Sequence, residues 1–139
     1  MDVFTRKLVI RYIVVYVAAT ILVSVVGYFL RKYTSAGTSG GLGIVPILVA
    51  SMEAGQYYYR QKSTLPPRPY AWKMAAIFTA VSVVISLILA AVVLPAGQFS
   101  AGGTGMMLGF VLGITVVYLV AAWFFFGFGA KNMKKAQSR

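Results

Sequence analysis

The sequence predicts an all-α integral membrane protein, a four-helix bundle with both ends of the chain in the cytoplasm (N-in/C-in). Three observations predict this class. The 139 residues are 60% hydrophobic and only 11% charged, which is more apolar surface than a small soluble domain can bury. Four long apolar stretches follow one another along the chain. Finally, 11 of the 13 Lys and Arg residues fall in segments that an alternating topology places on one side of the membrane.

The four apolar stretches define the predicted helices. We expect spans over about residues 9–30, 40–59, 71–94 and 106–128, which together form a single transmembrane domain over residues 1–139. Each is long enough to cross a hydrocarbon core of about 30 Å as an α-helix. The first apolar run, 12–30, has 19 residues and ends in Arg31 and Lys32. That is too long for the core of a typical signal peptide, so we expect a retained span.

The distribution of positive charge sets the predicted orientation. The N-terminal segment, the second connection and the C-terminal segment hold Arg6, Lys7, Arg11, Arg60, Lys62, Arg68, Lys73, Lys131, Lys134, Lys135 and Arg139. The first connection holds only Arg31 and Lys32, and the third holds no basic residue. Because basic residues concentrate in cytoplasmic segments, this pattern predicts that both ends are inside.

The second stretch is the least regular, because it contains Pro46, Glu53 and Gln56. If it were re-entrant, three spans with the N-terminus outside would place 10 basic residues inside and 3 outside. We favour four spans, since irregular helices cross membranes where neighbouring helices cover them.

Composition excludes several kinds of chemistry. The chain has no Cys and no His, which removes disulfides, thiolate ligands and the commonest general base and metal ligand. We therefore predict no catalytic residue, no cofactor, no metal site and no enzymatic activity. The net charge of +11 flanks apolar spans, so the expected partner is a bilayer with anionic headgroups on its cytoplasmic face, and not nucleic acid.

Glu53 is the most informative single residue. Apart from Asp2 it is the only acid in the chain, and it lies inside an apolar stretch. An ionisable group in a span is costly and is a candidate functional site. It could be a proton or cation site, or it could form an ion pair. Arg11 and Lys73 are expected at a similar depth, and we expect one of them to pair with Glu53, because an unpaired charge there would be expensive.

Gly105, Gly109 and Gly113 repeat a GxxxG pattern along the last span. Glycines at this spacing let a second helix backbone approach closely, so we expect a helix-packing face. The contact could be within this chain or with another protein. A second set of small or mildly polar residues, Ala75, Thr79, Ser82, Ser86 and Ala90, shares one face of the third span, and the first span offers Thr20, Ser24 and Gly27. These residues could line a pore, but packing is the interpretation we favour.

Three short segments carry a family resemblance. They are Gly43-x-x-Pro46, then Glu53-Ala54-Gly55-Gln56, then a basic Pro-containing connection that leads to Ala71-Trp72-Lys73. Together they resemble a family of small uncharacterised bacterial inner-membrane proteins with four transmembrane helices. The resemblance covers mainly the second and third spans. It implies a multi-pass protein of the bacterial inner membrane and implies no activity.

Two functions are compatible with these features. The first is a non-catalytic accessory or structural subunit, or an assembly factor, that packs against a larger membrane complex or against itself. The second is a small proton- or cation-coupled transporter centred on Glu53, similar in outline to small multidrug-resistance efflux proteins. Those proteins carry their carboxylate in the first span, and their antiparallel dimers need a weak charge bias. The strong bias here favours the first function.

Overall fold

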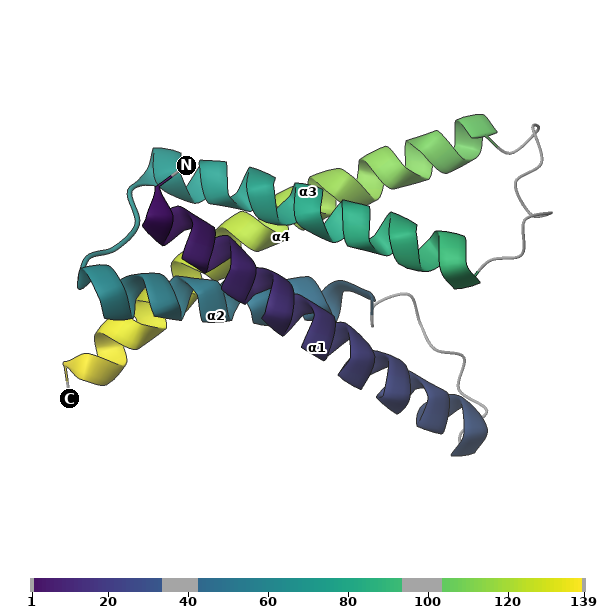
Figure 1. Cartoon of the computed structure of the whole chain (residues 1–139), viewed down its shortest axis with the longest axis horizontal. Coiled ribbons are helices and arrows are strands. Elements are labelled where there is room, and N and C mark those ends of the chain that lie inside the picture. Colours follow the sequence, from purple (N-terminus) through teal and green to yellow (C-terminus); the bar gives the residue numbers. More distant parts are fainter. Residues whose placement is uncertain (1, 34–42, 94–103, 139) are drawn as a thin grey trace.

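The structure, a computed structural model, describes residues 2–33, 43–93 and 104–138. Four α-helices make up its regular structure: α1 (Val3–Tyr33), α2 (Val45–Lys62), α3 (Arg68–Val93) and α4 (Thr104–Gln137). Successive helices run in opposite directions, so both chain ends and the α2–α3 connection lie at one end of the molecule (Figure 1). We call this the basic end, because α2 ends in Arg60 and Lys62 and the last turn of α4 carries Lys134 and Lys135.

Three of the helices are long and apolar enough to cross a membrane. The qualifying stretches are Val3–Tyr33, Arg68–Leu89 and Val111–Gln137. These stretches belong to α1, α3 and α4 and support a membrane protein, and the expected all-helical fold is confirmed. Helix α2 has 18 residues, or about 27 Å at the usual rise, and its polar residues set it apart from the other three.

Local sequence explains where α2 begins and ends. Pro46 lies in the first turn, where its missing N–H would have no partner within the helix. At the other end Ser63 adopts a left-handed conformation (φ 51°), and its N–H donates to the carbonyl of Tyr59 at 2.8 Å. Pro66 and Pro67 follow and cannot continue the helix. Helix α3 then begins at Arg68, three residues before the expected start of the third span.

Helix α4 is longer than the expected fourth span. It continues past residue 128 to Gln137, because no proline interrupts it and Gly129 and Ala130 are buried. Its extra turns carry basic residues beyond the apolar region. Helix α2 packs along both α4 and α1, and α3 packs chiefly on α4.

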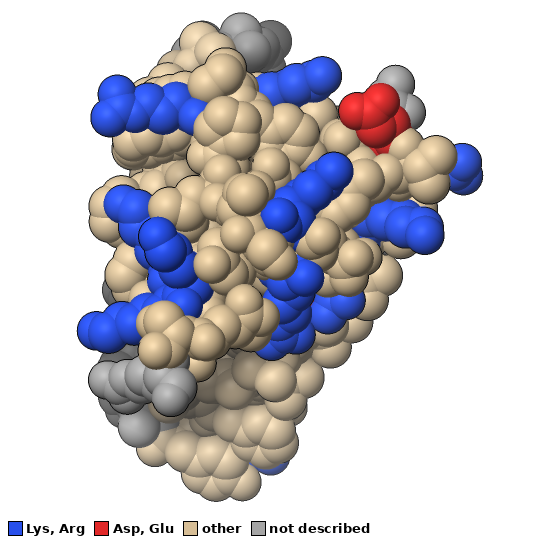
Figure 2. Space-filling model, turned by 90° about the vertical axis from the view of Figure 1, so that its left-hand side faces the viewer, with Lys and Arg blue, Asp and Glu red and all other residues tan. Residues whose placement is uncertain are grey.

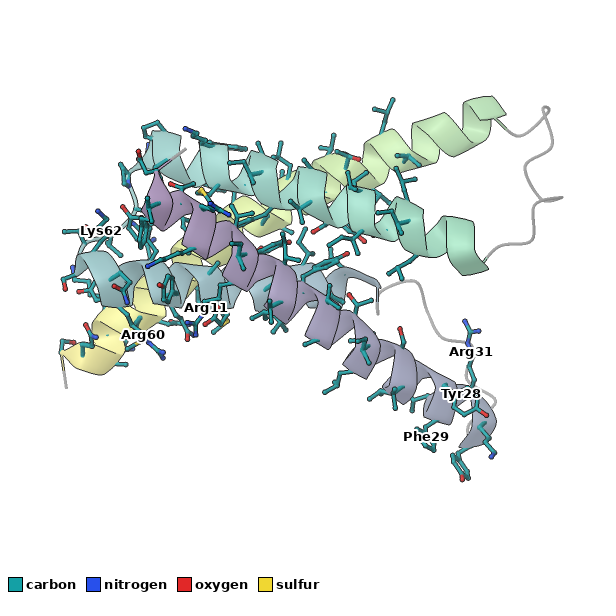
Figure 3. All side chains as sticks on the ribbon, in the orientation of Figure 1. Arg11, Tyr28, Phe29, Arg31, Arg60 and Lys62 are labelled. Atoms are coloured by element: carbon teal, nitrogen blue, oxygen red, sulfur yellow. The ribbon has the colours of Figure 1, made fainter. Side chains whose placement is uncertain are left out.

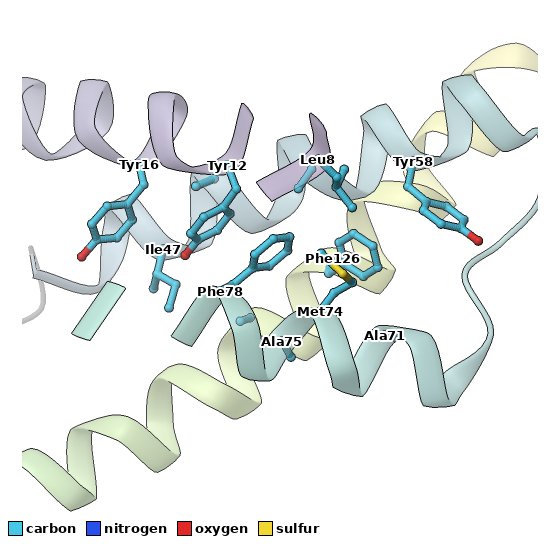
Figure 4. Packing of buried hydrophobic residues seen from close by; sticks show 13 residues of the cluster. Leu8, Tyr12, Tyr16, Ile47, Tyr58, Ala71, Met74, Ala75, Phe78 and Phe126 are labelled. Atoms are coloured by element: carbon cyan, nitrogen blue, oxygen red, sulfur yellow. The ribbon is translucent and has the colours of Figure 1, made fainter. Parts of the chain in front are cut away.

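The core lies among the four helices and is dominated by aromatic rings (Figure 4). Tyr12 of α1 stacks on Phe78 of α3, with ring centroids 4.0 Å apart and an interplanar angle of 3°. Phe78 in turn meets Phe126 of α4 edge-on at 5.8 Å. All three side chains are fully buried. The core therefore joins α1, α3 and α4, while Ile47 and Ala50 add α2 to it.

Much of the remaining apolar surface has no protein neighbour. Only 6% of the apolar window of α1 is buried, against 28% for α3. Past the core α1 and α4 diverge (Figure 1), and α1 exposes Ile21, Leu22, Val25, Tyr28 and Phe29. Within the part of the chain that the structure describes, these apolar faces are left for lipid or for another protein.

Candidate functional site

The structure brings Glu53 of α2 against Arg11 of α1. Two guanidinium nitrogens of Arg11, Nε and Nη2, each lie 2.8 Å from the same carboxylate oxygen, Oε1 of Glu53. Both residues lie on the side of their helix that faces the other, 42 positions apart in the chain. The contact is a charge-assisted hydrogen bond that ties α1 to α2.

Aromatic rings extend this cluster. The guanidinium carbon of Arg11 lies 4.5 Å from the ring centroid of Tyr57, one helical turn after Glu53, which is a cation–π contact. Tyr57 also stacks on Phe4 with ring centroids 6.2 Å apart. Arg11 is thus held between a carboxylate and a ring, and Figure 3 shows it on α1 beside α2. We call Arg11, Glu53 and Tyr57 the charged cluster.

The charged cluster is partly accessible. The side chain of Arg11 is 44% exposed and that of Glu53 is 25% exposed, so the pair lies at the α1–α2 edge and not inside the aromatic core. The second carboxylate oxygen of Glu53, Oε2, is nevertheless buried and has no hydrogen-bond partner among the described residues. The cluster can therefore neutralise the charge of Glu53 while one of its oxygens stays unsatisfied.

Of the two expected partners of Glu53, the structure places only Arg11 beside it. Lys73 is exposed on α3, and α3 contacts α2 much less than α1 does. Over the described residues, the single ion pair that Glu53 makes is with Arg11. Whether Glu53 pairs with Arg11 or with Lys73 depends on which helix packs against α2. The depth of a residue along its helix does not predict this.

The polar face of α3 is used for helix packing. The Tyr12 hydroxyl and the Ser82 hydroxyl are 2.8 Å apart, and those of Tyr16 and Ser86 are 3.3 Å apart. Ala75, Thr79 and Ser82 on the same face are buried, and the side chain of Ala90 lies outside the described ones. We call the two Tyr–Ser contacts the hydroxyl ladder. These tyrosines were not among the predicted contact residues; the matching four-residue spacing of 12/16 and 82/86 is the signal that could have paired them.

A small hollow lies beyond the ladder, between all four helices. Its volume is about 260 Å³, and its polar lining comes from Tyr16, Thr20, Ser24, Ser86 and Tyr118. Most of these hydroxyls are already bonded. Thr20 donates to the carbonyl of Tyr16 at 2.8 Å, and Tyr118 donates to the carbonyl of Gly43 at 3.3 Å. Glu53 does not line this hollow, so the structure does not connect the carboxylate to it.

Among the described residues, Gly109 and Gly113 do not make the close helix contact that was expected at the GxxxG face. A Cβ added to Gly109 or Gly113 would meet no atom within 4 Å. The surroundings of Gly105 lie outside the described side chains. The described part of the chain therefore gives no support to an intramolecular contact at Gly109 and Gly113. A contact with another protein stays a prediction.

Two other glycines make the close contact instead. A Cβ on Gly55 of α2 would collide with the carbonyl oxygen of Phe126, and one on Gly129 of α4 would collide with the carbonyl oxygen of Met52. The two backbones cross at this point, and each glycine makes room for the other helix. This crossing was not predicted from the sequence. Its signal was Ser51-x-x-x-Gly55, a small-residue pair one turn apart.

Many of the Lys and Arg side chains lie at the basic end of the molecule. Figure 2 looks onto the basic end, where Lys and Arg side chains project at many points from a mostly uncharged face. In Figure 3, Arg60 and Lys62 lie at this end, whereas Tyr28, Phe29 and Arg31 lie at the opposite end of α1. The N-terminal turn of α1 belongs to the basic end, since the hydroxyls of Thr5 and Tyr70 are 3.3 Å apart and Phe4 meets Tyr58 edge-on at 5.7 Å.

Comparison with models of protein families, with curated proteins and with solved structures found no match. The resemblance to small four-span inner-membrane proteins therefore stays a prediction.

Proposed function

We propose that the protein is a non-catalytic accessory or structural subunit that packs against a larger membrane complex through α4. The observation that carries this proposal is the open face at Gly109 and Gly113, where no described residue would lie within 4 Å of an added Cβ. Large apolar side chains continue along the same helix, among them Leu112, Val116, Val117 and Val120, all more than half exposed. Lipid gains little from glycine, whereas a second helix can approach it closely.

The state of Glu53 supports the same function. A membrane carboxylate that carries a coupling proton needs freedom to change its charge. Here Arg11 holds the carboxylate, and Tyr57 covers the guanidinium. An ion pair of this kind fits a clamp between α1 and α2. The alternative, a proton- or cation-coupled transporter, draws support from the buried and unpartnered Oε2 of Glu53.

For the arrangement in the membrane we propose four spans with both ends in the cytoplasm of a bacterial cell and the protein in the inner membrane. The basic end carries most of the positive charge, which supports placing it inside. The contact between Thr5 and Tyr70 supports placing the N-terminus on the same side as the α2–α3 connection.

Purification from native membranes tests the proposed function. Gly109→Leu and Gly113→Leu should each abolish recovery of a stoichiometric larger partner and leave the thermal stability of the purified chain unchanged, because both sites are open within the chain. Ala18→Leu, at an exposed position on α1, is the control and should retain the partner. Parent-level recovery with both glycine variants would overturn the proposal. Proton-coupled uptake into liposomes that is lost in Glu53→Gln would favour the transporter.

A further inference from the structure

A second feature of the basic end is a broad hollow between the start of α3 and the last turns of α4. Its volume is about 610 Å³, within the range of about 300–1,000 Å³ that is usual for small-molecule sites. Two tryptophans form its wall: Trp72 of α3 and Trp123 of α4 stack with ring centroids 5.0 Å apart and an interplanar angle of 17°. Phe124 and Phe128 continue the apolar wall along α4. The hollow is therefore shaped by two helices and lined mainly by rings.

The lining carries positive charge and no negative charge. Arg68 at the first position of α3 and Lys131 in the extended part of α4 both belong to it, and both are exposed. The two acids of the chain are elsewhere, since Asp2 lies at the N-terminus and Glu53 is bound to Arg11. Two cations from different helices thus border an apolar hollow without an acid to neutralise them.

We propose that this hollow is a binding site for one anionic phospholipid. Arg68 and Lys131 would hold the phosphate-containing headgroup, and an acyl chain would lie along the Trp and Phe wall. Tryptophan is typical of the membrane–water interface, and basic pockets between helices at that depth suit anionic headgroups. On α4 the lining of the hollow begins at Trp123, ten residues after Gly113, so the lipid site and the glycine positions share no residue.

A glycine in the wall of the hollow, Gly127, also suits an acyl chain. Gly127 lines the hollow between Phe124 and Phe128, and a Cβ there would meet no atom within 4 Å. Unlike Gly55 and Gly129, it is not required by a neighbouring helix. Its effect is to keep the hollow open on the side of α4 where an acyl chain would lie.

The tryptophans supply a direct assay. The chain has only two, and both line the hollow, so quenching of its Trp fluorescence reports an occupant there. The protein is reconstituted in phosphatidylcholine vesicles that contain either brominated phosphatidylglycerol or brominated phosphatidylcholine. A basic residue near the surface is worth about five-fold in binding an anionic lipid, so we expect at least a five-fold preference for phosphatidylglycerol at low salt. Equal quenching by the two lipids would overturn the site.

Matched charge variants separate a defined site from general surface charge. Arg68→Gln/Lys131→Gln should reduce the preference to near one. The control Arg60→Gln/Lys134→Gln removes the same charge from the basic end outside the hollow and should keep most of the preference. Loss of equal size in both double variants would mean that headgroups are attracted by the whole surface and would reject the proposal.

A further variant tests the acyl-chain part. Gly127→Leu should fill the hollow and lower quenching by both brominated lipids, whereas Gly113→Leu, also in open space on α4, should not. Unchanged quenching in Gly127→Leu would show that the chain lies outside the hollow and would overturn this placement. Circular dichroism and the elution volume should match the parent for every variant compared.

Discussion

Removing Arg11 should destabilise the protein more than removing the charge of Glu53, although the two residues share one contact. Arg11→Gln would leave the carboxylate without a cation, while one of its oxygens is already buried without a partner. We expect it to lower the free energy of unfolding by about 2 kcal/mol, between the values for exposed and buried pairs. Glu53→Gln should lower it less, because the long Arg side chain can reach toward the headgroups.

A double-mutant cycle measured by reversible unfolding in micelles isolates the pair. Arg11→Gln/Glu53→Gln should be close to Glu53→Gln alone, since the stranded charge is gone. Additive effects of the two single changes would mean that the 2.8 Å contact contributes no coupling and would contradict the clamp.

Tyr12 gives a second residue-scale prediction. Tyr12→Phe keeps the stack on Phe78 but removes the hydroxyl that meets Ser82 at 2.8 Å, inside the core. We expect a loss of about 1 kcal/mol in unfolding free energy, because a buried hydroxyl then lacks its partner. Tyr16→Phe is the control: its contact with Ser86 is longer, 3.3 Å, and only partly buried, so the loss should be about half or less. Equal losses would show that the hydroxyl ladder does not depend on burial.

The partners of Glu53 and Tyr12 could be predicted from the sequence only in part. Depth along a helix follows from residue counting, and it limited the partner of Glu53 to Arg11 or Lys73. Choosing between them required knowing that α1 and not α3 lies against that side of α2. Likewise, Tyr12 is an ordinary apolar residue in the sequence, and only the packing of α1 on α3 reveals its hydroxyl contact.

At the scale of elements, the two glycine sets had opposite outcomes. The regular spacing of Gly109 and Gly113 predicted a close contact, yet neither meets another helix among the described residues. The less regular Gly55 and Gly129 lie where α2 crosses α4. Spacing indicates that a helix face can accept a neighbour; which face receives one depends on the length and direction of the other helices.

The α2–α4 crossing should therefore be the most sensitive helix contact to added volume. Gly55→Ala and Gly129→Ala each place a methyl group against a backbone carbonyl, which cannot move like a side chain. We expect each to lower the unfolding free energy by about 2 kcal/mol or more. Gly113→Ala should not lower it and should raise it by up to about 1 kcal/mol, since alanine favours the helix over glycine and would meet no described atom. Thermal unfolding of the three variants in one detergent checks this order, and a tolerated Gly55→Ala would contradict it.

For the whole molecule, the number and order of helices followed from apolar stretches, and their approximate limits followed from length. The extension of α4 to Gln137 and the divergence of α1 and α4 did not. Hydropathy measures how well a helix suits lipid; it says nothing about how much of that helix contacts protein. That is why α1, the most hydropathic of the three candidate spans, has only 6% of its apolar window buried.

The N-terminal contacts bear on the choice between four spans and three. Three spans with the N-terminus outside would put the start of α1 and the start of α3 on opposite faces of the membrane. Yet Thr5 and Tyr70, in the first turns of these two helices, have hydroxyls 3.3 Å apart. The same end of α1 meets the C-terminal end of α2 through Phe4 and Tyr58. These contacts support the proposed four spans. If α1 and α3 start on the same side of the membrane, the chain must cross back between them, and α2 is the helix that lies between them in the chain.

Single cysteines in this naturally cysteine-free chain test that arrangement. With an impermeant thiol reagent applied to intact cells, Ser100→Cys should be labelled from outside, and Asp2→Cys, Ser63→Cys and Ser138→Cys only after the membrane is opened. Asp2→Cys is the decisive variant. Four spans keep it inside with Ser138→Cys, whereas three spans place it outside while Ser63→Cys and Ser138→Cys remain inside. Labelling of Asp2→Cys in intact cells would contradict the four-span arrangement and separate residues that the Thr5–Tyr70 contact holds together.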